Sequence, residues 1–386
     1  MNSFPLPSPP PDAQQHSQQL VRLIQGEIET RGGWMGFDRF MALALYAPGM
    51  GYYSAGLEKF GATGDFVTAP EISSFFGHCI AQQTAQVLEK TGGDILELGA
   101  GSGKLALDVL LELDRLGRLP ERYLILEVSK NLRERQKIYL KSNIDVHIMQ
   151  KIFWIDALPE DFCGLMLANE VLDALPVHLV RQTPQGLYER GVVSDGDGFA
   201  WSDRLLEESE LKQLAAELDL PQNYLTEVNL AGRGLVASLA DCLQCGMMLL
   251  VDYGFPRREF YHAQREAGTL MCHTRQMAHD DPFWFPGLQD ITAHVDFTAI
   301  AEAGVAQGLQ LAGYTTQARF LMNCGITTLL EQTPPQEAHI YLPKVAEVQK
   351  LLSPAEMGEL FKVIAFSRDL ELTPMGFASG DQSFRL

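Results

Sequence analysis

The stretch "DILELGAGSGKLALDVLLEL", residues 94–113, constrains the fold of this chain more than any other feature. An apolar run leads directly into three glycines, Gly99, Gly101 and Gly103, and helix-forming residues follow. A strand, a glycine turn and a helix in this order are typical of α/β proteins that bind a ligand outside the carboxyl ends of parallel strands. We therefore predict a ligand site at this turn.

Strand and helix signals alternate along most of the chain after this turn, which predicts a mostly parallel sheet with crossover helices. Strands are expected at residues 94–98, 123–128, 146–149, 165–169 and 246–254, and within 309–321 and 360–366. Helices are expected near residues 37–46, 73–90, 104–116, 129–140 and 205–218. The pattern predicts a seven-stranded α/β fold.

The same signals divide the chain into regions. The proline-rich start, residues 1–16, is expected to be a disordered tail, and residues 17–72 a helical cap region. Residues 73–386 hold the sheet, with insertions at about 182–232 and 254–298. The first insertion contains hairpin signals around "SDGDG". The second reads as long and irregular, which is usual for functional or disordered loops.

Composition narrows the function classes. The net charge of −19 over 386 residues disfavours a general nucleic-acid binder and would attract a basic peptide or a small cation. No apolar run approaches the roughly 20 residues that a membrane span needs. The start shows neither a secretory signal nor a mitochondrial presequence. A cytoplasmic protein of bacterial type is the simplest expectation.

The six cysteines are scattered, which favours reduced thiols over a disulfide framework. Cys242 and Cys245 in "CLQC" have the spacing of a redox or zinc half-site, but no second pair follows them. His273 and His279 in "HTRQMAHDD" also lack a set of further ligands at suitable spacing. We therefore expect no metal site.

Three ligand classes can be compared at the glycine turn. A P-loop needs a glycine five residues before its Gly-Lys pair and Ser or Thr after it, and this chain has leucine at both positions. Gly101, Gly103 and Ala106 do satisfy the dinucleotide pattern G-x-G-x-x-A, and Glu127 lies where a ribose-binding acid belongs. A nucleoside-containing cofactor is therefore expected.

Glu97, directly before the turn, distinguishes between the two remaining cofactor classes, a dinucleotide such as NAD and a sulfonium cofactor. Its carboxylate would repel a pyrophosphate, whereas S-adenosylmethionine (SAM) carries a sulfonium and an ammonium that a carboxylate attracts. Glycines allow close approach of the backbone to the cofactor, and the two oxygens of Glu127 would accept both ribose hydroxyls. SAM fits this turn better than NAD does. A plain glycine turn with two solvated acids is the alternative.

Several stretches of the chain resemble the MidA family of SAM-dependent methyltransferases. They are "GYYS", "GDFVTAPEISSFFG", "ELGAGSG", "LEVS", "ANEVLDALPVH", "VDYG", "DITAHVDF" and "MGELFKVIAF". The resemblance implies a class I methyltransferase fold, Rossmann-like, with a seven-stranded, mostly parallel sheet. The mitochondrial member of this family is an arginine methyltransferase that assists the assembly of respiratory complex I. The methyl acceptor that the resemblance implies is therefore an arginine of a protein partner, in the family a subunit of NADH dehydrogenase.

The resemblance also implies which residues hold the cofactor. The glycine turn and Glu97 would contact the methionine moiety, Glu127 the ribose, and the residues after the third strand the adenine. Ala100 stands where the family usually has proline, and we expect the turn to tolerate it. The expected cofactor-binding residues are Glu97, Gly99, Ala100, Gly101, Gly103, Glu127, Trp154, Ile155, Asp156, Asn169 and Asp65.

The segment "ANEVLDALPVH" at the tip of the fourth strand would face the transferable methyl group. It offers Asn169, Glu170 and Asp173, which we expect to be catalytic. A guanidinium is protonated and delocalised, so carboxylates that orient it bidentately can localise its charge away from the attacking nitrogen. Glu170 is the first choice for this role and Asp173 the second, with helix capping as the alternative for Asp173. His178 would accept a late proton or be structural.

Other polar residues could surround the same site. In "GDFVTAPEISS", Thr68, Glu71 and Ser73 could contact the cofactor, or they could cap the helix that follows. Residues that could line the substrate entrance are Asp252, Tyr253, Asp290, His294 and Asp296. Two rival functions stay open, a small-molecule methyltransferase and a non-catalytic assembly factor that binds SAM.

Overall fold

The structure of this protein is a computed structural model, which describes residues 6–55, 68–334 and 337–386. The chain divides into two compact units. The first unit comprises residues 1–58, 176–228 and 263–293, and the second comprises residues 59–175, 229–262 and 294–386. Parts of both expected insertions therefore form one compact unit with the N-terminal region.

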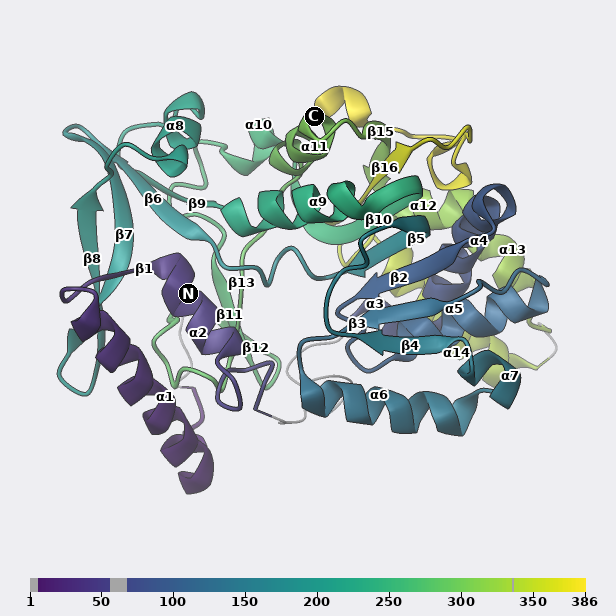
Figure 1. The fold of residues 1–386 in the computed structure, drawn as a ribbon, viewed down its shortest axis with the longest axis horizontal. Helices are drawn as coiled ribbons and strands as arrows, with labels where there is room; N and C mark the ends of the chain where they lie inside the picture. Colours follow the sequence, from purple (N-terminus) through teal and green to yellow (C-terminus); the bar gives the residue numbers. More distant parts are fainter. Residues whose placement is uncertain (1–5, 56–67, 335–336) are drawn as a thin grey trace. The chain divides into compact units, whose positions relative to one another are not determined.

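An eight-stranded sheet forms the centre of the second unit as far as its described residues show (Figure 1). Seven strands follow the order β15-β16-β10-β5-β2-β3-β4, and β14 pairs with β10 off this path. The strands are β2 (Asp94–Leu98), β3 (Tyr123–Leu126), β4 (Ile152–Ile155), β5 (Phe162–Asn169), β10 (Leu243–Phe255), β14 (Val295–Asp296), β15 (Gln310–Thr316) and β16 (Phe361–Arg368). Only β16 runs antiparallel to its neighbours, so the expected mostly parallel sheet is confirmed.

Helices cover both faces of this sheet. They are α3 (Ala69–Ile72), α4 (Ser74–Thr91), α5 (Lys104–Arg115), α6 (Lys130–Asn143), α7 (Val146–Met149), α9 (Leu230–Cys242), α10 (Arg257–Phe260), α11 (Phe297–Ala306), α12 (Gln317–Asn323), α13 (Ile326–Glu331) and α14 (Ala338–Leu352). Because strand side chains alternate, Ile95 of β2 packs in the core that contains α4 and α5, and Leu96 packs in the core that contains α9 and α11. Glu97 therefore shares the face of Ile95.

The first unit contains two antiparallel sheets among its described residues. One has the order β1-β7-β6-β9, with β8 paired to β7, and the other has the order β12-β11-β13. The elements are α1 (Pro11–Thr30), β1 (Met35–Gly36), α2 (Phe37–Tyr46), β6 (His178–Thr183), β7 (Gly186–Asp195), β8 (Gly198–Leu205), α8 (Glu210–Glu217), β9 (Tyr224–Val228), β11 (Met271–Thr274), β12 (Met277–His279) and β13 (Asp290–Thr292). The hairpin expected at "SDGDG" is confirmed by the β7–β8 pairing.

Three expected elements are wrong. Residues 146–149 form helix α7, and the third strand is β4, because a four-residue apolar run does not distinguish a strand from a short helix. Residues 317–321 begin helix α12, where the Thr316 hydroxyl accepts a hydrogen bond from the Arg319 N–H. The second insertion is not irregular throughout, since β11, β12 and β13 pair within it.

The expected disordered tail is also wrong for residues 11–16, which are helical. Helix α1 begins at Pro11, and proline is favoured at the first helical position because its fixed φ suits the helix and its missing N–H is not needed there. The helix is held by a buried stripe that includes Leu20, Ile24 and Ile28. These residues recur at four-residue spacing within the expected helical cap region, but the helix begins nine residues before Leu20.

A disulfide joins Cys163 of β5 to Cys245 of β10, with 4.7 Å between their Cα atoms. The expectation of reduced thiols is therefore wrong for these two cysteines, because parallel pairing brings them opposite each other although they are 82 residues apart in sequence. The cysteines Cys79, Cys242, Cys272 and Cys324 are free and buried. Within the described ranges, no helix combines the length and the apolar character that a bilayer crossing requires.

Candidate active site at the carboxyl ends of the parallel strands

The glycine turn leaves the carboxyl end of β2 and leads into α5. Gly99, Gly101 and Gly103 have φ values of 62°, 55° and 85°, a region that glycine occupies without the steric cost of a Cβ. The N–H of Gly99 donates to the carbonyl of Leu126 at 3.0 Å, which fixes the turn against the end of β3. Ala100 does not have a positive φ, so the turn accommodates this residue as expected.

Glu97 is buried in β2 directly before this turn. The hydroxyl of Tyr123 donates to its Oε2 at 2.8 Å. Burial raises the pKa of Glu97 to about 7, the charge of Glu127 adds to this rise, and the hydrogen bond from Tyr123 opposes it. A carboxylate with these surroundings is stabilised in its ionised form when a cation binds beside it.

Glu127 follows the end of β3, and two protein donors orient its carboxylate. Its Oε1 accepts from the N–H of Ser129 at 2.9 Å, and its Oε2 accepts from Nε2 of Gln136 at 3.1 Å. The Ser129 hydroxyl in turn caps α6 by accepting from the N–H of Leu132. The cap and the buried face of α6 therefore fix the carboxylate that was expected to bind ribose.

Gln136 is a residue of this site that the sequence analysis did not identify. Its Nε2 donates to the carbonyl of Gly101 at 2.9 Å in addition to Glu127. Leu132, Gln136 and Leu140 form the buried face of α6, at intervals of four residues. An amide within an otherwise apolar helical stripe is the sequence signal that could have indicated it.

Trp154 and Ile155 end β4 with their side chains on opposite faces of the sheet. Trp154 packs against the core that contains α5, and its Nε1–H donates to Oε1 of Gln136 at 2.9 Å. Ile155 packs against the opposite core. Trp154 is therefore linked to Glu127 through a single amide, whereas Ile155 lies on the other side of the strand.

Asp156 lies just after β4 with a highly exposed side chain. It forms an ion pair with Arg133 at 2.7 Å. Arg133 also donates from Nε to the carbonyl of Glu127 at 2.6 Å. The chain around Asp156 is not helical, so Asp156 does not cap a helix.

The tip of β5 carries Asn169 and Glu170. Glu170 has φ 53°, unusual for a residue with a side chain, and its N–H donates to the carbonyl of Val251 at 2.9 Å. Its Oε1 accepts from Nδ2 of Asn169 at 3.1 Å and from the N–H of Ala69 at 3.4 Å. Oδ1 of Asn169 is buried with no hydrogen-bond partner among the described residues.

Asp173 and Asp252 form a buried acidic pair beside Glu170. Oδ2 of Asp252 accepts the N–H groups of Leu172 and Asp173 at 2.8 and 3.2 Å, so this residue clamps the loop after β5. Burial raises the pKa of Asp252 well above its usual value, and the charges of Asp173 and Glu170 add to this rise. Burial also raises the pKa of Asp173 to about 6, and a hydrogen bond from Tyr253 opposes this rise.

Comparison with known proteins identifies the family. The model of a family described as "Putative S-adenosyl-L-methionine-dependent methyltransferase" matches residues 79–315. The chain belongs to this family. Its cofactor is S-adenosyl-L-methionine, which supplies a methyl group carried on a sulfonium.

Individual proteins that are similar to this chain are also described as methyltransferases. A likely methyl transferase from Burkholderia thailandensis, solved bound to S-adenosyl-homocysteine, is 47% identical, with a TM-score of 0.96 over 99% of this chain and 100% of that chain. Protein arginine methyltransferase NDUFAF7 of Danio rerio is 30% identical over 84% of this chain and 81% of that protein. The homologue from Drosophila melanogaster is 29% identical over 90% of this chain and 84% of that protein.

The residues at the strand ends suit this cofactor. The buried carboxylate of Glu97 offers a counter-charge to a cationic group, and Glu127 presents a fixed carboxylate to hydroxyl donors. The buried Oδ1 of Asn169 can accept a hydrogen bond from a ligand donor. The individual cofactor contacts stay predictions, but this set of acceptor oxygens fits a cation that carries a ribose.

The segment around α3 connects the two halves of this site. Ala69 contacts Glu170, as above, and the Ser102 hydroxyl of the glycine turn donates to Oε1 of Glu71. The Ser73 hydroxyl accepts from the N–H of Phe75 at 3.3 Å and so caps α4, which confirms the helix-capping alternative for this residue. Thr68 gives no side-chain cap. Asp65 lies outside the described residues.

The capping alternative for Asp173 is wrong, because no helix follows it in the described residues 174–178. Residues expected at the substrate entrance belong to different units. Asp290, in the first unit, accepts from the Tyr53 hydroxyl at 3.0 Å. In the second unit, Asp296 caps α11, and His294 packs edge-on against Tyr253. Asp296 therefore has a structural role.

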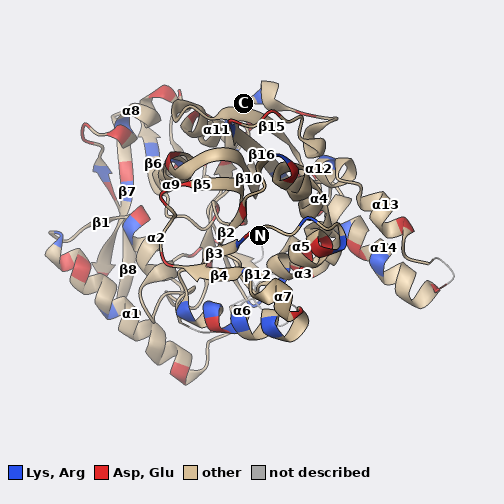
Figure 2. Ribbon diagram, turned by 45° about the vertical axis from the view of Figure 1, so that its right-hand side comes forward, with Lys and Arg blue, Asp and Glu red and all other residues tan. Residues whose placement is uncertain are grey.

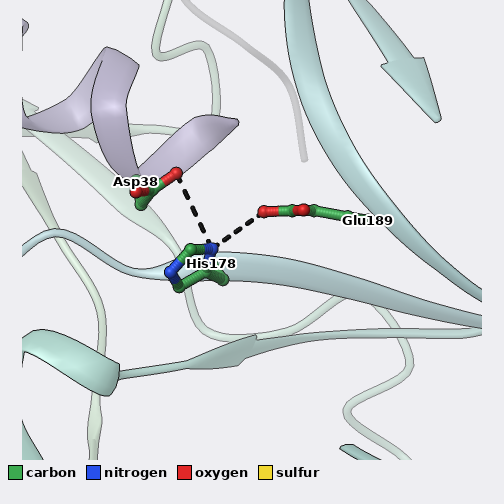
Figure 3. Close-up of side chains that lie close together, drawn as sticks. All are labelled: Asp38, His178 and Glu189. Atoms are coloured by element: carbon green, nitrogen blue, oxygen red, sulfur yellow. Dashed lines mark hydrogen bonds and ion pairs between the residues drawn. The ribbon is translucent and has the colours of Figure 1, made fainter. Parts of the chain in front are cut away.

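His178 lies in the first unit with two carboxylates that face the same nitrogen of its ring (Figure 3). Nδ1 of His178 is 2.8 Å from Oε1 of Glu189 and 3.6 Å from Oδ1 of Asp38. Burial lowers the pKa of His178, but the hydrogen bond to Glu189 and the charge of Asp38 outweigh it, and the net pKa is raised. These residue types could hold a divalent cation. The ion pair itself supports the structural alternative for His178.

Replacing His178 by Gln is expected to destabilise the protein more at pH 6 than at pH 8. A histidine whose folded-state pKa is raised contributes stability below its unfolded value, and this contribution is lost as the pH rises through the folded value. We expect the two variant effects to differ by about 0.5–1 kcal/mol in urea unfolding. His339→Gln, at an exposed histidine, is the control. Equal effects of His178→Gln at both pH values would contradict the raised pKa.

Proposed function

We propose that this methyltransferase transfers the methyl group to the guanidinium of an arginine in a protein partner. The observation that carries the proposal is the group of three carboxylates formed by Glu170, Asp173 and Asp252 at the ends of β5 and β10. Oδ1 of Asp173 is buried without a hydrogen-bond partner among the described residues. Such an oxygen is costly unless a ligand donor reaches it.

A guanidinium matches this group in charge and in shape. It stays protonated at all relevant pH values, with a pKa above about 12, and its planar N–H groups pair with carboxylates two at a time. Burial raises the pKa of both Asp173 and Asp252, and repulsion from Asp173 and Glu170 adds to the rise for Asp252. A bound guanidinium would relieve this repulsion, which favours a cationic over a neutral acceptor.

Each of the three carboxylates has a different role in the proposed methyl transfer. Glu170 orients the guanidinium and localises its charge away from the attacking nitrogen. Asp252 holds the loop of Asp173 through two backbone N–H groups. The attacking nitrogen must lose one proton when its bond to the methyl carbon forms, and Asp173 accepts it, since its pKa of about 6 suits this exchange. Alignment of the nitrogen supplies the remaining rate enhancement.

The relatives support this acceptor by name. The proteins from Danio rerio and Drosophila melanogaster are called protein arginine methyltransferases. The family resemblance makes a subunit of NADH dehydrogenase the first partner to test. The net charge of −19 also favours association with a basic segment.

The test is incubation of the purified protein with methyl-tritiated SAM and a lysate of its host. The proposal predicts label in the protein fraction, released as methylarginine after acid hydrolysis. Label confined to lipids or metabolites would replace the proposal with a small-molecule acceptor. SAM binding without transfer to any fraction would favour a non-catalytic assembly factor.

A further inference from the structure

Gln136 is the fully buried polar side chain of helix α6, whose other polar residues are partly or fully exposed. Figure 2 shows basic residues along α6. These are Lys130, Arg133, Arg135, Lys137 and Lys141. Gln136 has a relative exposure of 0%, and burying an amide is costly unless its donors and acceptor are satisfied. The buried amide of Gln136 must therefore be satisfied by specific hydrogen bonds.

Three bonds from the amide join three separate segments of the cofactor site. Nε2 donates to the carbonyl of Gly101 at 2.9 Å and to Oε2 of Glu127 at 3.1 Å, and Oε1 accepts from Nε1 of Trp154 at 2.9 Å. These partners belong to the glycine turn, the end of β3 and the end of β4. The Gly99 N–H also joins the turn to β3, and Arg133 joins the ends of β3 and β4, but both bond to backbone carbonyls. Gln136 bonds to the Glu127 carboxylate and to the Trp154 indole, the side chains expected at the cofactor.

The chemistry of the partners fixes the orientation of the amide. The carbonyl of Gly101 and the carboxylate of Glu127 only accept, whereas the indole N–H of Trp154 only donates. A flipped amide would place an oxygen against two acceptors and an NH₂ against a donor. The Gln136 Cγ also lies where a Cβ on Gly103 would be 3.5 Å away, so the side chain packs on the turn itself.

We propose that Gln136 is a positioning residue that sets the selectivity of this site for the ribose and adenine of its cofactor. It holds the Glu127 carboxylate in the orientation that accepts the ribose hydroxyls and holds the Trp154 ring at the adenine end. The inference rests on the assignment of Glu127 to the ribose. It does not depend on the methyl acceptor, because it concerns cofactor binding alone.

The test compares S-adenosylhomocysteine with its 2′-deoxyribose analogue by calorimetry. The wild type should prefer the ribose form by roughly tenfold or more, because a hydroxyl donates to a charged acceptor. In Gln136→Met, which keeps the length but removes all three bonds, this preference should fall to about twofold. The KM for SAM should rise by about tenfold while kcat changes by less than about threefold. Arg135→Met, at the exposed neighbouring position, should leave the ribose preference and the KM for SAM unchanged.

A purely structural role would weaken both ligands equally, so an unchanged ribose preference in a folded Gln136→Met protein would overturn the proposal. Trp154→Phe provides a second variant if Gln136→Met does not fold, since it removes only the indole bond to Oε1. That variant should reduce the ribose preference by about two- to fivefold, because the amide can then rotate away from Glu127. A wild-type preference in Trp154→Phe would overturn the proposal in the same way.

Discussion

Glu170→Gln is expected to lower methyl transfer by about 100-fold or more while SAM binds within about twofold of its wild-type affinity. The amide keeps an oxygen that can accept from Asn169 and from the Ala69 N–H, so the geometry of the strand tip should persist. It loses the negative charge that would localise the charge of a guanidinium. Calorimetry with SAM and a turnover assay on the labelled protein fraction measure the two effects separately.

Glu160→Gln is the matched control, since Glu160 is an exposed glutamate of the same unit. It should retain both binding and turnover. Unchanged turnover in Glu170→Gln would remove Glu170 from its proposed role. A parallel loss of SAM binding and turnover would instead assign Glu170 to the cofactor.

Glu97→Gln is expected to weaken SAM binding by about 30- to 100-fold at pH 8, because a buried carboxylate beside a cation contributes a charge-assisted contact. In the wild type, affinity should rise with pH and level off above about 7, the pKa of Glu97 in the unliganded protein. Below that pH, binding of a cation must first release the proton from Glu97. Glu97→Gln should lose this pH dependence, which calorimetry from pH 5.5 to 8.5 would measure.

The same substitution should stabilise the unliganded protein. The pKa of Glu97 is raised from 4.5 to about 7 in the folded state, so the folded state binds more protons between these values and stability falls as the pH rises through them. Above pH 7 the buried charge costs about 3 kcal/mol, which the neutral amide avoids while still accepting from Tyr123. Glu121→Gln, at an exposed acid, should change neither stability nor affinity. Stability lower than wild type at pH 8 would contradict the buried-charge account.

The parallel sheet and the cofactor could be predicted from the sequence because their signals are local. The apolar run before Gly99 and the glycines themselves lie within one short stretch, and the acids that separate SAM from NAD end neighbouring strands. Short runs gave less information: residues 146–149 have the composition of a strand, yet four residues of that kind also form a helical turn.

Features created by tertiary pairing could not be predicted. Cys163 and Cys245 are bonded because β5 and β10 pair in parallel, which no spacing in the sequence reveals. The ion pair of His178 with Asp38 and Glu189 joins three separate segments in the same way. Asp252, expected only to line the substrate entrance, proves to clamp the loop after β5 through backbone hydrogen bonds. Such contacts depend on the register of strands and on loop paths.

The most direct test of the proposed chemistry is tandem mass spectrometry of a lysate treated with SAM and either the wild-type protein or Glu170→Gln. The proposed function predicts peptides that gain a methyl group on an arginine with the wild-type protein and lack it with the variant. Methylation confined to lysine or to small molecules, or equal arginine methylation with both proteins, would contradict it.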